Sequence, residues 1–360
     1  MKTYPIPMVP GPVSVPRAVL DAFADNYGSA DMEAEFFDLY DRTASGLQEI
    51  MATANTVVLQ SGEGMVVLWS ALKNCLLPGD RVLSVATGLF GHGIAEMAGV
   101  LGAEVRKVSL PDDRTISETG GIEEAIEAFK PKMITAVHCE TPSGTLNPLA
   151  DLGRLKKAHG VPLFYVDAVS SIGGAPVLTD DWNIDLCLGG AQKCLSAPPD
   201  MAFLSVSEEA WAIVEQVDYS GYDALKPFRG VQKTHSFPYT PNWHGLAALN
   251  AGVELILAEG PAAVFERHAR VADTCRRGLT DMGLTLFPAP GSISSPTVTA
   301  VYLPGSTPWV DFDQKLRRRG LVVGGSYGKL AGKIFRLGHM GSQADETLVR
   351  RALDAIAAGL

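Results

Sequence analysis

The chain has 360 residues, of which 46% are hydrophobic and 19% charged, and it carries a formal net charge of −10 at pH 7. This length suggests about two domains, and the acidic balance argues against nucleic acid or a membrane surface as a partner. No apolar run reaches the roughly 18 residues of a membrane span. The proline-rich start is unlike a signal peptide. Five cysteines without a C-x-x-C pair predict buried free thiols and a reducing, cytoplasmic location.

Strand-like and helix-like segments alternate along the first two thirds of the chain. Apolar, β-rich runs predict strands at residues 55–60, 81–86, 104–110, 133–138, 163–167, 185–188 and 202–206. Helical patterns lie between several of them, at residues 63–77, 91–101, 121–130 and 149–159. This alternation predicts an α/β fold with a mostly parallel sheet of about seven strands and helices on both faces.

The pattern changes in the last third of the chain. Two long helices are expected at residues 243–258 and 261–282, followed by strands at 297–303, 321–324 and 333–337 and helices at 310–319 and 344–358. Such a mixture predicts a smaller α+β domain at the C-terminal end. We therefore expect an N-terminal segment (residues 1–15), a large domain (16–250) and a small domain (251–360).

Lys193 and Asp167 form the most informative pair in the sequence. Each follows an apolar, strand-like run, and 26 residues separate them. The carboxyl ends of strands in an α/β sheet face the ligand crevice. An amine in apolar surroundings has a lowered pKa and becomes a good nucleophile, although most lysines are solvated and many aspartates cap helices. An amine and an acid brought together suit pyridoxal phosphate, which needs a lysine and an acid beside its ring nitrogen.

Further side chains follow predicted strands or lie within them. The Ser- and Gly-containing turn at residues 60–64 resembles an anion site at a helix N-terminus. Phe90 is either a core residue or a platform for a flat ring, and Thr141 lies in a Pro/Gly turn. Arg336, in an apolar run, suits a substrate carboxylate or an interdomain ion pair. The seven histidines form no metal-binding pattern, so no metal site is predicted.

Nearly the whole chain resembles the class V aminotransferases of fold type I, in the branch of the alanine–glyoxylate and serine–glyoxylate aminotransferases. The segments that carry this resemblance are residues 9–12 (Val-Pro-Gly-Pro), 61–62, 140–144 (Glu-Thr-Pro-Ser-Gly), 166–171, 192–193 (Gln-Lys), 197–199 (Ala-Pro-Pro), 239–241 and 336–338. The resemblance implies a homodimer with shared active sites, in which Lys193 forms the Schiff base and moves protons.

The same resemblance assigns roles to other residues. It implies that Asp167 pairs with the pyridinium nitrogen, that Phe90 stacks on the ring beside Thr141, and that Arg336 binds the substrate carboxylate near Tyr327. It further implies a phosphate held by Ser61, Gly62 and Gln192, with Thr240 reaching the phosphate of the neighbouring subunit.

Two positions depart from the glyoxylate-type pattern. Glu63 stands where His is usual, and Phe237 stands where a Tyr commonly donates to the phosphate. Both replacements look like pyridoxamine–pyruvate aminotransferase, a relative that takes the unphosphorylated vitamin as substrate. Gln192 instead matches the family members that retain pyridoxal phosphate as a cofactor. Tyr327 stands where pyridoxamine–pyruvate aminotransferase has an arginine.

The leading hypothesis is therefore a pyridoxal-phosphate-dependent aminotransferase that moves an amino group from a small donor to pyruvate or glyoxylate. The alternative is pyridoxamine–pyruvate transfer, with pyridoxamine or pyridoxal as substrate. A lyase on the same fold is a further alternative, although a cysteine desulfurase needs a loop cysteine and none follows Cys275. A non-catalytic binding protein is opposed by the presence of Asp167, Lys193 and Arg336 together.

Overall fold

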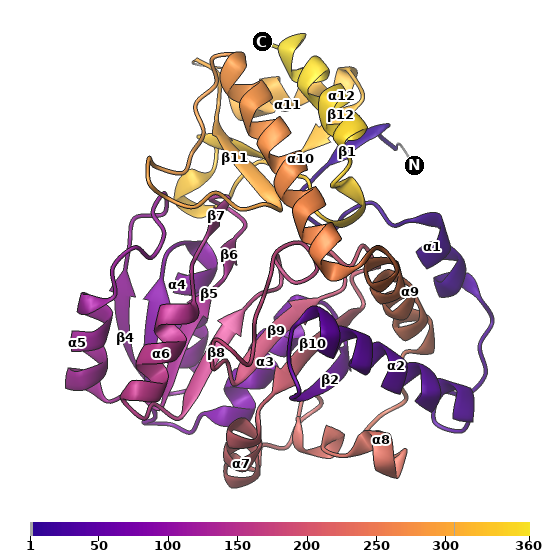
Figure 1. The fold of residues 1–360 in the computed structure, drawn as a ribbon, viewed down its shortest axis with the longest axis vertical. Coiled ribbons are helices and arrows are strands. Elements are labelled where there is room, and N and C mark those ends of the chain that lie inside the picture. Colours follow the sequence, from indigo (N-terminus) through magenta and orange to yellow (C-terminus); the bar gives the residue numbers. More distant parts are fainter. Residues whose placement is uncertain (1–2, 306) are drawn as a thin grey trace.

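The centre of the protein is a seven-stranded sheet, seen in a computed structural model that describes residues 3–305 and 307–360 (Figure 1). In spatial order its strands are β2 (Thr56–Ser61), β10 (Met201–Val206), β9 (Leu186–Gly190), β8 (Leu163–Asp167), β5 (Met133–Val137), β3 (Arg81–Ala86) and β4 (Glu104–Ser109). Strand β10 runs antiparallel to both of its neighbours, whereas the other pairs are parallel. The predicted α/β class with a mostly parallel sheet is confirmed.

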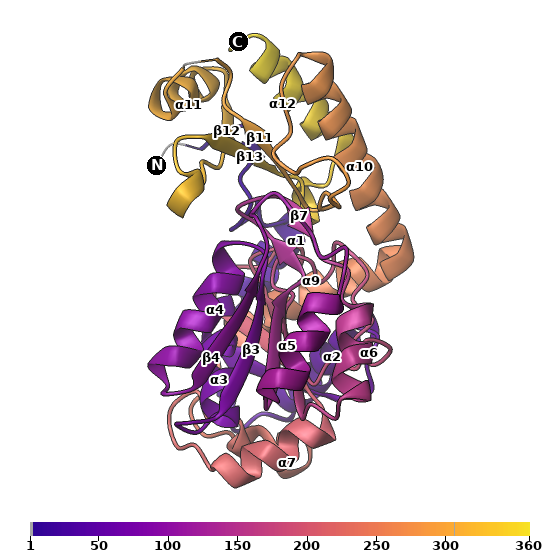
Figure 2. The same ribbon diagram turned by 90° about the vertical axis from the view of Figure 1, so that its left-hand side faces the viewer.

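Helices cover both faces of this sheet, as Figure 2 shows. One face carries α3 (Gly64–Cys75) and α4 (Leu89–Val100), and the other carries α2 (Ala34–Ile50), α5 (Gly120–Phe129) and α6 (Ala150–Ala158). Strand β8 reads Leu-Phe-Tyr-Val-Asp and is buried along its whole length, because a strand covered on both faces needs apolar side chains on both. The remaining elements of this region are α1 (Arg17–Ala24), β6 (Cys139–Glu140), β7 (Thr145–Leu146), α7 (Glu208–Val217), η1 (Lys226–Phe228) and α8 (Val231–Thr234).

A second, smaller core lies above the carboxyl ends of the large sheet (Figure 1). Its strands are β11 (Val298–Tyr302), which is antiparallel to β13 (Ile334–Gly338), and β12 (Leu321–Val323), which is parallel to the N-terminal β1 (Ile6–Met8). Its helices and turns are α10 (Pro261–Asp281), α11 (Trp309–Arg318), η2 (Gly328–Leu330), η3 (Gly341–Gln343) and α12 (Glu346–Ala357). The N-terminal strand thus belongs to the C-terminal core.

Helix α9 (Trp243–Glu259) joins the two cores. It packs against α1 and α2 of the large core, and the chain bends by 88° at Gly260 before α10 begins. The expected domain boundary at residue 250 falls inside α9. The chain passes from the large core to the small core after the bend at Gly260. Proline at the first position of α10 suits a helix start, because its missing N–H is not needed there. No single helix of residues 3–305 and 307–360 is long and apolar enough to cross a bilayer.

Candidate active site

Asp167 and Lys193 line one cavity of about 200 Å³ at the carboxyl edge of the large sheet. Asp167 is the last residue of β8, and Lys193 follows the neighbouring parallel strand β9 by three residues. Phe90, Val169 and Ser170 are among the other residues that line the same cavity. The structure therefore brings together the amine, the acid and the aromatic ring that the sequence singled out.

The Lys193 amine is buried and lies near another cation. Burial, and secondly the positive charge of Arg336, lower the pKa of Lys193 below its usual value. Its Nζ donates a hydrogen bond to the Pro10 carbonyl at 2.9 Å. A lysine with a depressed pKa has a larger neutral fraction at neutral pH, so this amine is suited to attack a carbonyl carbon.

Asp167 is 5% exposed and supports the turn that follows its strand. Its Oδ1 accepts a hydrogen bond from the Val169 N–H at 3.0 Å. Burial raises the pKa of Asp167 to about 6, while the hydrogen bond and the Lys193 charge act in the opposite direction. A buried carboxylate of this kind gains most from a cationic partner, such as a protonated ring nitrogen. Asp167 can therefore keep its hydrogen bond from Val169 and also bind a cationic ligand.

Glu140 fixes the backbone that carries Phe90. Its two carboxylate oxygens accept from the N–H groups of Phe90 (3.1 Å) and Gly91 (2.7 Å) at the start of α4. Glu140 is fully buried, and this burial raises its pKa to about 8. A Cβ on Gly88 would lie 2.7 Å from the Glu140 Cδ, so the carboxyl group fits only beside glycine. No role was predicted for Glu140 from the sequence, and its place in the motif at residues 140–144 was the available signal.

Arg336 is a buried cation whose hydrogen bonds are made to backbone carbonyls. On β13 it is 3% exposed, and it donates to the carbonyls of Gly325 (2.7 Å) and Thr141 (3.3 Å). The Tyr327 ring stacks on the guanidinium at 4.9 Å. No acidic side chain within residues 3–305 and 307–360 forms an ion pair with it, which excludes the interdomain ion pair considered above. A buried cation without a counter-charge is a strong candidate for binding an anionic ligand.

Thr141 supports this arrangement from the large domain. Its carbonyl holds Arg336, and its hydroxyl is 2.5 Å from the hydroxyl of Ser170, which lines the cavity. Thr141 thus contacts Arg336 and Ser170, and its role beside a cofactor ring stays a prediction.

Glu63 occupies the helix end where a phosphate was expected. It is the N-cap of α3, and its Oε1 accepts from the Met65 N–H at 3.1 Å. Its Oε2 accepts from the Gln192 side-chain amide at 3.0 Å. The two groups best placed to bind a phosphate, a helix N-terminal N–H and a side-chain amide, are therefore already bound to a carboxylate.

Ser61 and Gly62 lie apart from this cavity. The Gly62 N–H donates to the Asp200 carbonyl at 2.8 Å, so it does not point to an anion. Ser61 lines a separate cavity of about 550 Å³ with Trp69 and Tyr222. Of the three residues expected to hold a phosphate, Gln192 alone lines the cavity of Asp167 and Lys193.

Comparisons with known proteins agree with this geometry. The aminotransferase class-V family model matches residues 10–334. The chain is a class V aminotransferase. It is 35% identical to an uncharacterized aminotransferase of Methanocaldococcus jannaschii, over 93% of this chain and 87% of the other. It is 34% identical to pyridoxamine–pyruvate transaminase of Mesorhizobium japonicum, over 91% and 84%.

Solved structures give the same result for the fold. Alanine–glyoxylate aminotransferase from Nostoc sp. superposes with a TM-score of 0.95 and 28% identity, covering 100% of this chain and 96% of the other. The protein is thus a fold type I enzyme of the pyridoxal-phosphate-dependent aminotransferase family.

The site of this aminotransferase fits one half of pyridoxal phosphate better than the other. The ring half has a cavity, a buried acid and a nearby amine. The phosphate half holds Glu63, whose negative charge repels a phosphate at the same position. The residues present fit a pyridoxal ring, and in this arrangement of side chains they do not fit its phosphate.

Five other residues that the sequence assigned to the site do not line this cavity: Thr141, Phe237, Thr240, Tyr327 and Arg336. Phe237 packs edge-on against Phe36 and Tyr40 in an aromatic cluster of its own chain. Thr240 is exposed. Neither residue lines the cavity of Asp167 and Lys193, and their role toward a neighbouring subunit stays a prediction.

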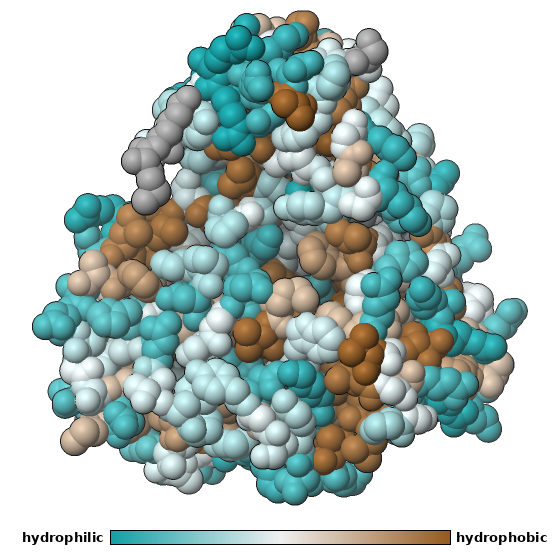
Figure 3. All heavy atoms as spheres, turned by 180° about the vertical axis from the view of Figure 1, so that it is seen from behind, coloured by the Kyte–Doolittle hydropathy of each residue, from teal (hydrophilic) through white to brown (hydrophobic). Residues whose placement is uncertain are grey.

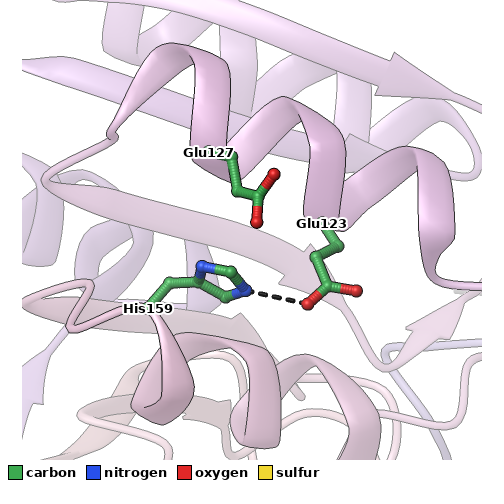
Figure 4. A group of neighbouring side chains, drawn as sticks. All are labelled: Glu123, Glu127 and His159. Atoms are coloured by element: carbon green, nitrogen blue, oxygen red, sulfur yellow. Dashed lines mark hydrogen bonds and ion pairs between the residues drawn. The ribbon is translucent and has the colours of Figure 1, made fainter.

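One cluster of possible metal ligands lies away from this site (Figure 4). Glu123 and Glu127 project from α5 towards His159, which ends α6. His159 Nε2 and Glu123 Oε1 are 2.9 Å apart, and this hydrogen bond accounts for their proximity. Glu127 and His159 also line a cavity of about 700 Å³ at the amino-terminal edge of the sheet. Arg81, Lys130 and Lys132 line the same cavity, and their positive charges disfavour the binding of a metal ion there. Ligands of α/β sheets bind at the opposite edge.

Proposed function

We propose that this aminotransferase transfers the amino group of pyridoxamine, the unphosphorylated form of the vitamin, to a small 2-oxo acid such as pyruvate or glyoxylate. The observation that carries this proposal is the pair of hydrogen bonds from Met65 and Gln192 to the Glu63 carboxylate. Through these bonds the Glu63 carboxylate supplies the negative charge at the N-terminus of α3. The site therefore has no need of an anionic group on the substrate ring. Similarity to a relative named for pyridoxamine and pyruvate supports the same donor.

Arg336 supports an acidic acceptor. Its planar guanidinium can bind a carboxylate through two parallel hydrogen bonds, and it lies close enough to Lys193 to lower the pKa of that amine. Arg336 does not itself line the cavity, and among the described residues that do, Lys193 is the one cationic side chain. A single guanidinium near Lys193 suits a monocarboxylic 2-oxo acid of small size.

The residues of the chain divide the work in this proposal. A bound pyridoxal ring supplies an electron sink for proton transfer at the neighbouring carbon. Asp167 holds a proton on the ring nitrogen, and Phe90 supports one face of the ring. Arg336 fixes the acid, and Lys193 Nζ moves a proton between the substrate carbon and the ring side chain. In the complete reaction, pyridoxamine and the 2-oxo acid give pyridoxal and the corresponding amino acid.

A second candidate keeps pyridoxal phosphate as a bound cofactor. Gln192 favours it, because its amide would donate to a phosphate if Glu63 rotated away. The Glu63 side chain is partly exposed to solvent. In that case the amino donor is a small amino acid, and Lys193, Asp167 and Arg336 keep the same roles.

We further infer a homodimer, in which Phe237 and Thr240 of one subunit approach the site of the other. Met65 is 37% exposed and Tyr222 67% exposed, and both line the cavity that contains Ser61. On the face seen from behind, hydrophobic residues gather in patches among hydrophilic ones (Figure 3). Such patches are typical of protein contact surfaces. Light scattering of the purified protein tests this inference; a monomer at working concentration contradicts it.

All five cysteines are free and buried, which supports a location in the reducing cytoplasm.

The proposed donor is tested by incubating the purified protein with pyridoxamine and pyruvate. Pyridoxal and alanine should appear in equal amounts. The small molecules released on denaturing the purified protein should also be identified by mass. Pyridoxal phosphate at full occupancy, with no turnover of pyridoxamine, would favour the second candidate.

A further inference from the structure

The segment before residue 14 crosses from one core to the other directly over Lys193. Strand β1 is paired with β12 in the small domain, and the Val13 N–H donates to the Gln192 carbonyl in the large domain at 3.1 Å. Between these two attachments, the chain passes the lysine side chain. This segment therefore contacts both domains and the reactive amine.

Pro10 is held firmly in this segment. It is buried, and the positions of Gly324 and Gly338, on either side of Arg336, leave the space that its ring and backbone fill. A Cβ on Gly324 would lie 2.8 Å from the Pro10 Cδ, and one on Gly338 would lie 2.4 Å from the Pro10 Cα. Gln343 also donates to the preceding carbonyl, that of Val9, at 2.8 Å. The Pro10 carbonyl is thus a fixed acceptor.

That carbonyl holds the Lys193 amine at 2.9 Å. Within residues 3–305 and 307–360, no other hydrogen bond of the amine is recorded. The amine therefore points to the N-terminal segment, and within the described residues it forms no hydrogen bond with Asp167, although both residues line the same cavity.

Gly11 provides the space for this contact. A Cβ on Gly11 would lie 2.6 Å from both Cδ and Nζ of Lys193, well inside van der Waals contact. The φ angle of Gly11 is +91°, in the region that favours glycine. Of the neighbouring atoms, those of the flexible lysine side chain are the ones that must move when a methyl group is added here.

We propose that the Pro10 carbonyl is the resting site of the Lys193 amine, and that Gly11 keeps this site open. The carbonyl positions the amine whenever it is not joined to the substrate ring. Joining the aldehyde carbon of pyridoxal removes both hydrogens of the neutral amine, which leave with the aldehyde oxygen as water, so the bond to Pro10 is lost. The freed amine returns to Pro10, from which it can move a proton. This catalytic part rests on the proposed function, whereas the resting position does not.

The test compares Gly11→Ala with the matched control Gly79→Ala. Gly79 has a φ of +88°, and no heavy atom lies within 4 Å of the position of an added Cβ. Both variants therefore place a methyl group on a residue of similar positive φ, and only the one in Gly11→Ala meets the lysine. The first readout is acylation of Lys193 by an amine reagent in the ligand-free protein, measured by mass spectrometry. The second is the rate of pyridoxal formation from pyridoxamine and pyruvate.

We expect the melting temperatures of the two variants to fall by similar amounts. Lys193 in Gly11→Ala should be acylated several-fold faster than in the unchanged protein, and turnover should fall roughly tenfold or more, since small misplacements of a reacting group are costly. Gly79→Ala should change neither. Equal acylation and turnover in both variants would overturn the proposal.

Two further results keep the test decisive. If Gly11→Ala does not fold, a crystal structure of the unchanged, ligand-free protein decides, and an Nζ outside hydrogen-bond distance of the Pro10 carbonyl overturns the proposal. A protein that shows the expected acylation but no turnover of pyridoxamine would refute the proposed donor and support the resting position.

Discussion

The ring half and the phosphate half of the active site differ in how their polar groups are satisfied. The ring half contains a buried acid and an amine of lowered pKa, and the Arg336 cation near that amine forms no ion pair within residues 3–305 and 307–360. In the phosphate half, Glu63 already accepts hydrogen bonds from Met65 and Gln192. One half is therefore arranged for a ligand, whereas the other is complete without one.

This difference shows how a family site can be changed without changing its fold. The strands still deliver Asp167 and Lys193 to the same edge of the sheet. A single acidic side chain at the N-terminus of α3 takes the position of an external anion.

Removal of the amine should abolish the function of the ring half. Lys193→Ala is expected to lower turnover by at least 10³-fold, because the variant loses both the nucleophile and the group that moves the proton. The visible absorbance that develops on adding pyridoxal should also disappear. An active protein that still turns yellow would contradict the assignment of Lys193.

Removal of the Arg336 cation should weaken the interaction with the 2-oxo acid and leave the binding of the pyridoxal ring nearly unchanged. Each charge-assisted hydrogen bond contributes about 1.5–3 kcal/mol, so Arg336→Gln is expected to lower kcat/KM for pyruvate roughly 10- to 100-fold. The affinity for pyridoxal should change little. Steady-state kinetics and equilibrium binding separate the two effects, and an unchanged kcat/KM would show that another group binds the acid.

The smallest effect concerns Glu140, which supports Phe90. Burial raises the pKa of Glu140 from 4.5 to about 8, so the folded state holds this proton more tightly than the unfolded chain. Stability from this group is therefore present below pH 4.5 and is lost as pH rises to about 8. Over that window the melting temperature should fall by about 6 °C more in the unchanged protein than in Glu140→Gln. Parallel curves for the two proteins would contradict the raised pKa.

Local sequence patterns predicted the helices and strands and the residues of the ring half of the active site. The alternation of apolar strands with helices indicated the sheet, and its connectivity then required Asp167 and Lys193 to end neighbouring strands. Arg336 was recognisable as a single charge in a buried run. These features depend on short stretches of chain, which a sequence displays directly.

The phosphate half could not be predicted in the same way. The hydrogen bond between Glu63 and Gln192 joins residues 129 positions apart in the sequence. The Gly62 N–H is taken by the Asp200 carbonyl, a backbone contact that no residue type reveals. Which polar groups are already satisfied is a property of the folded molecule, and it decided the role of this half.

The most direct test of the account measures the affinities of the unchanged protein and of Glu63→Gln for pyridoxal and for pyridoxal phosphate. Exposed Glu118→Gln serves as a control for the loss of one charge. The account predicts that the unchanged protein and the control prefer pyridoxal, and that Glu63→Gln shifts the ratio roughly 10- to 100-fold towards pyridoxal phosphate. Tighter binding of pyridoxal phosphate by the unchanged protein, with the same ratio in Glu63→Gln, would contradict the claim that Glu63 takes the place of the phosphate.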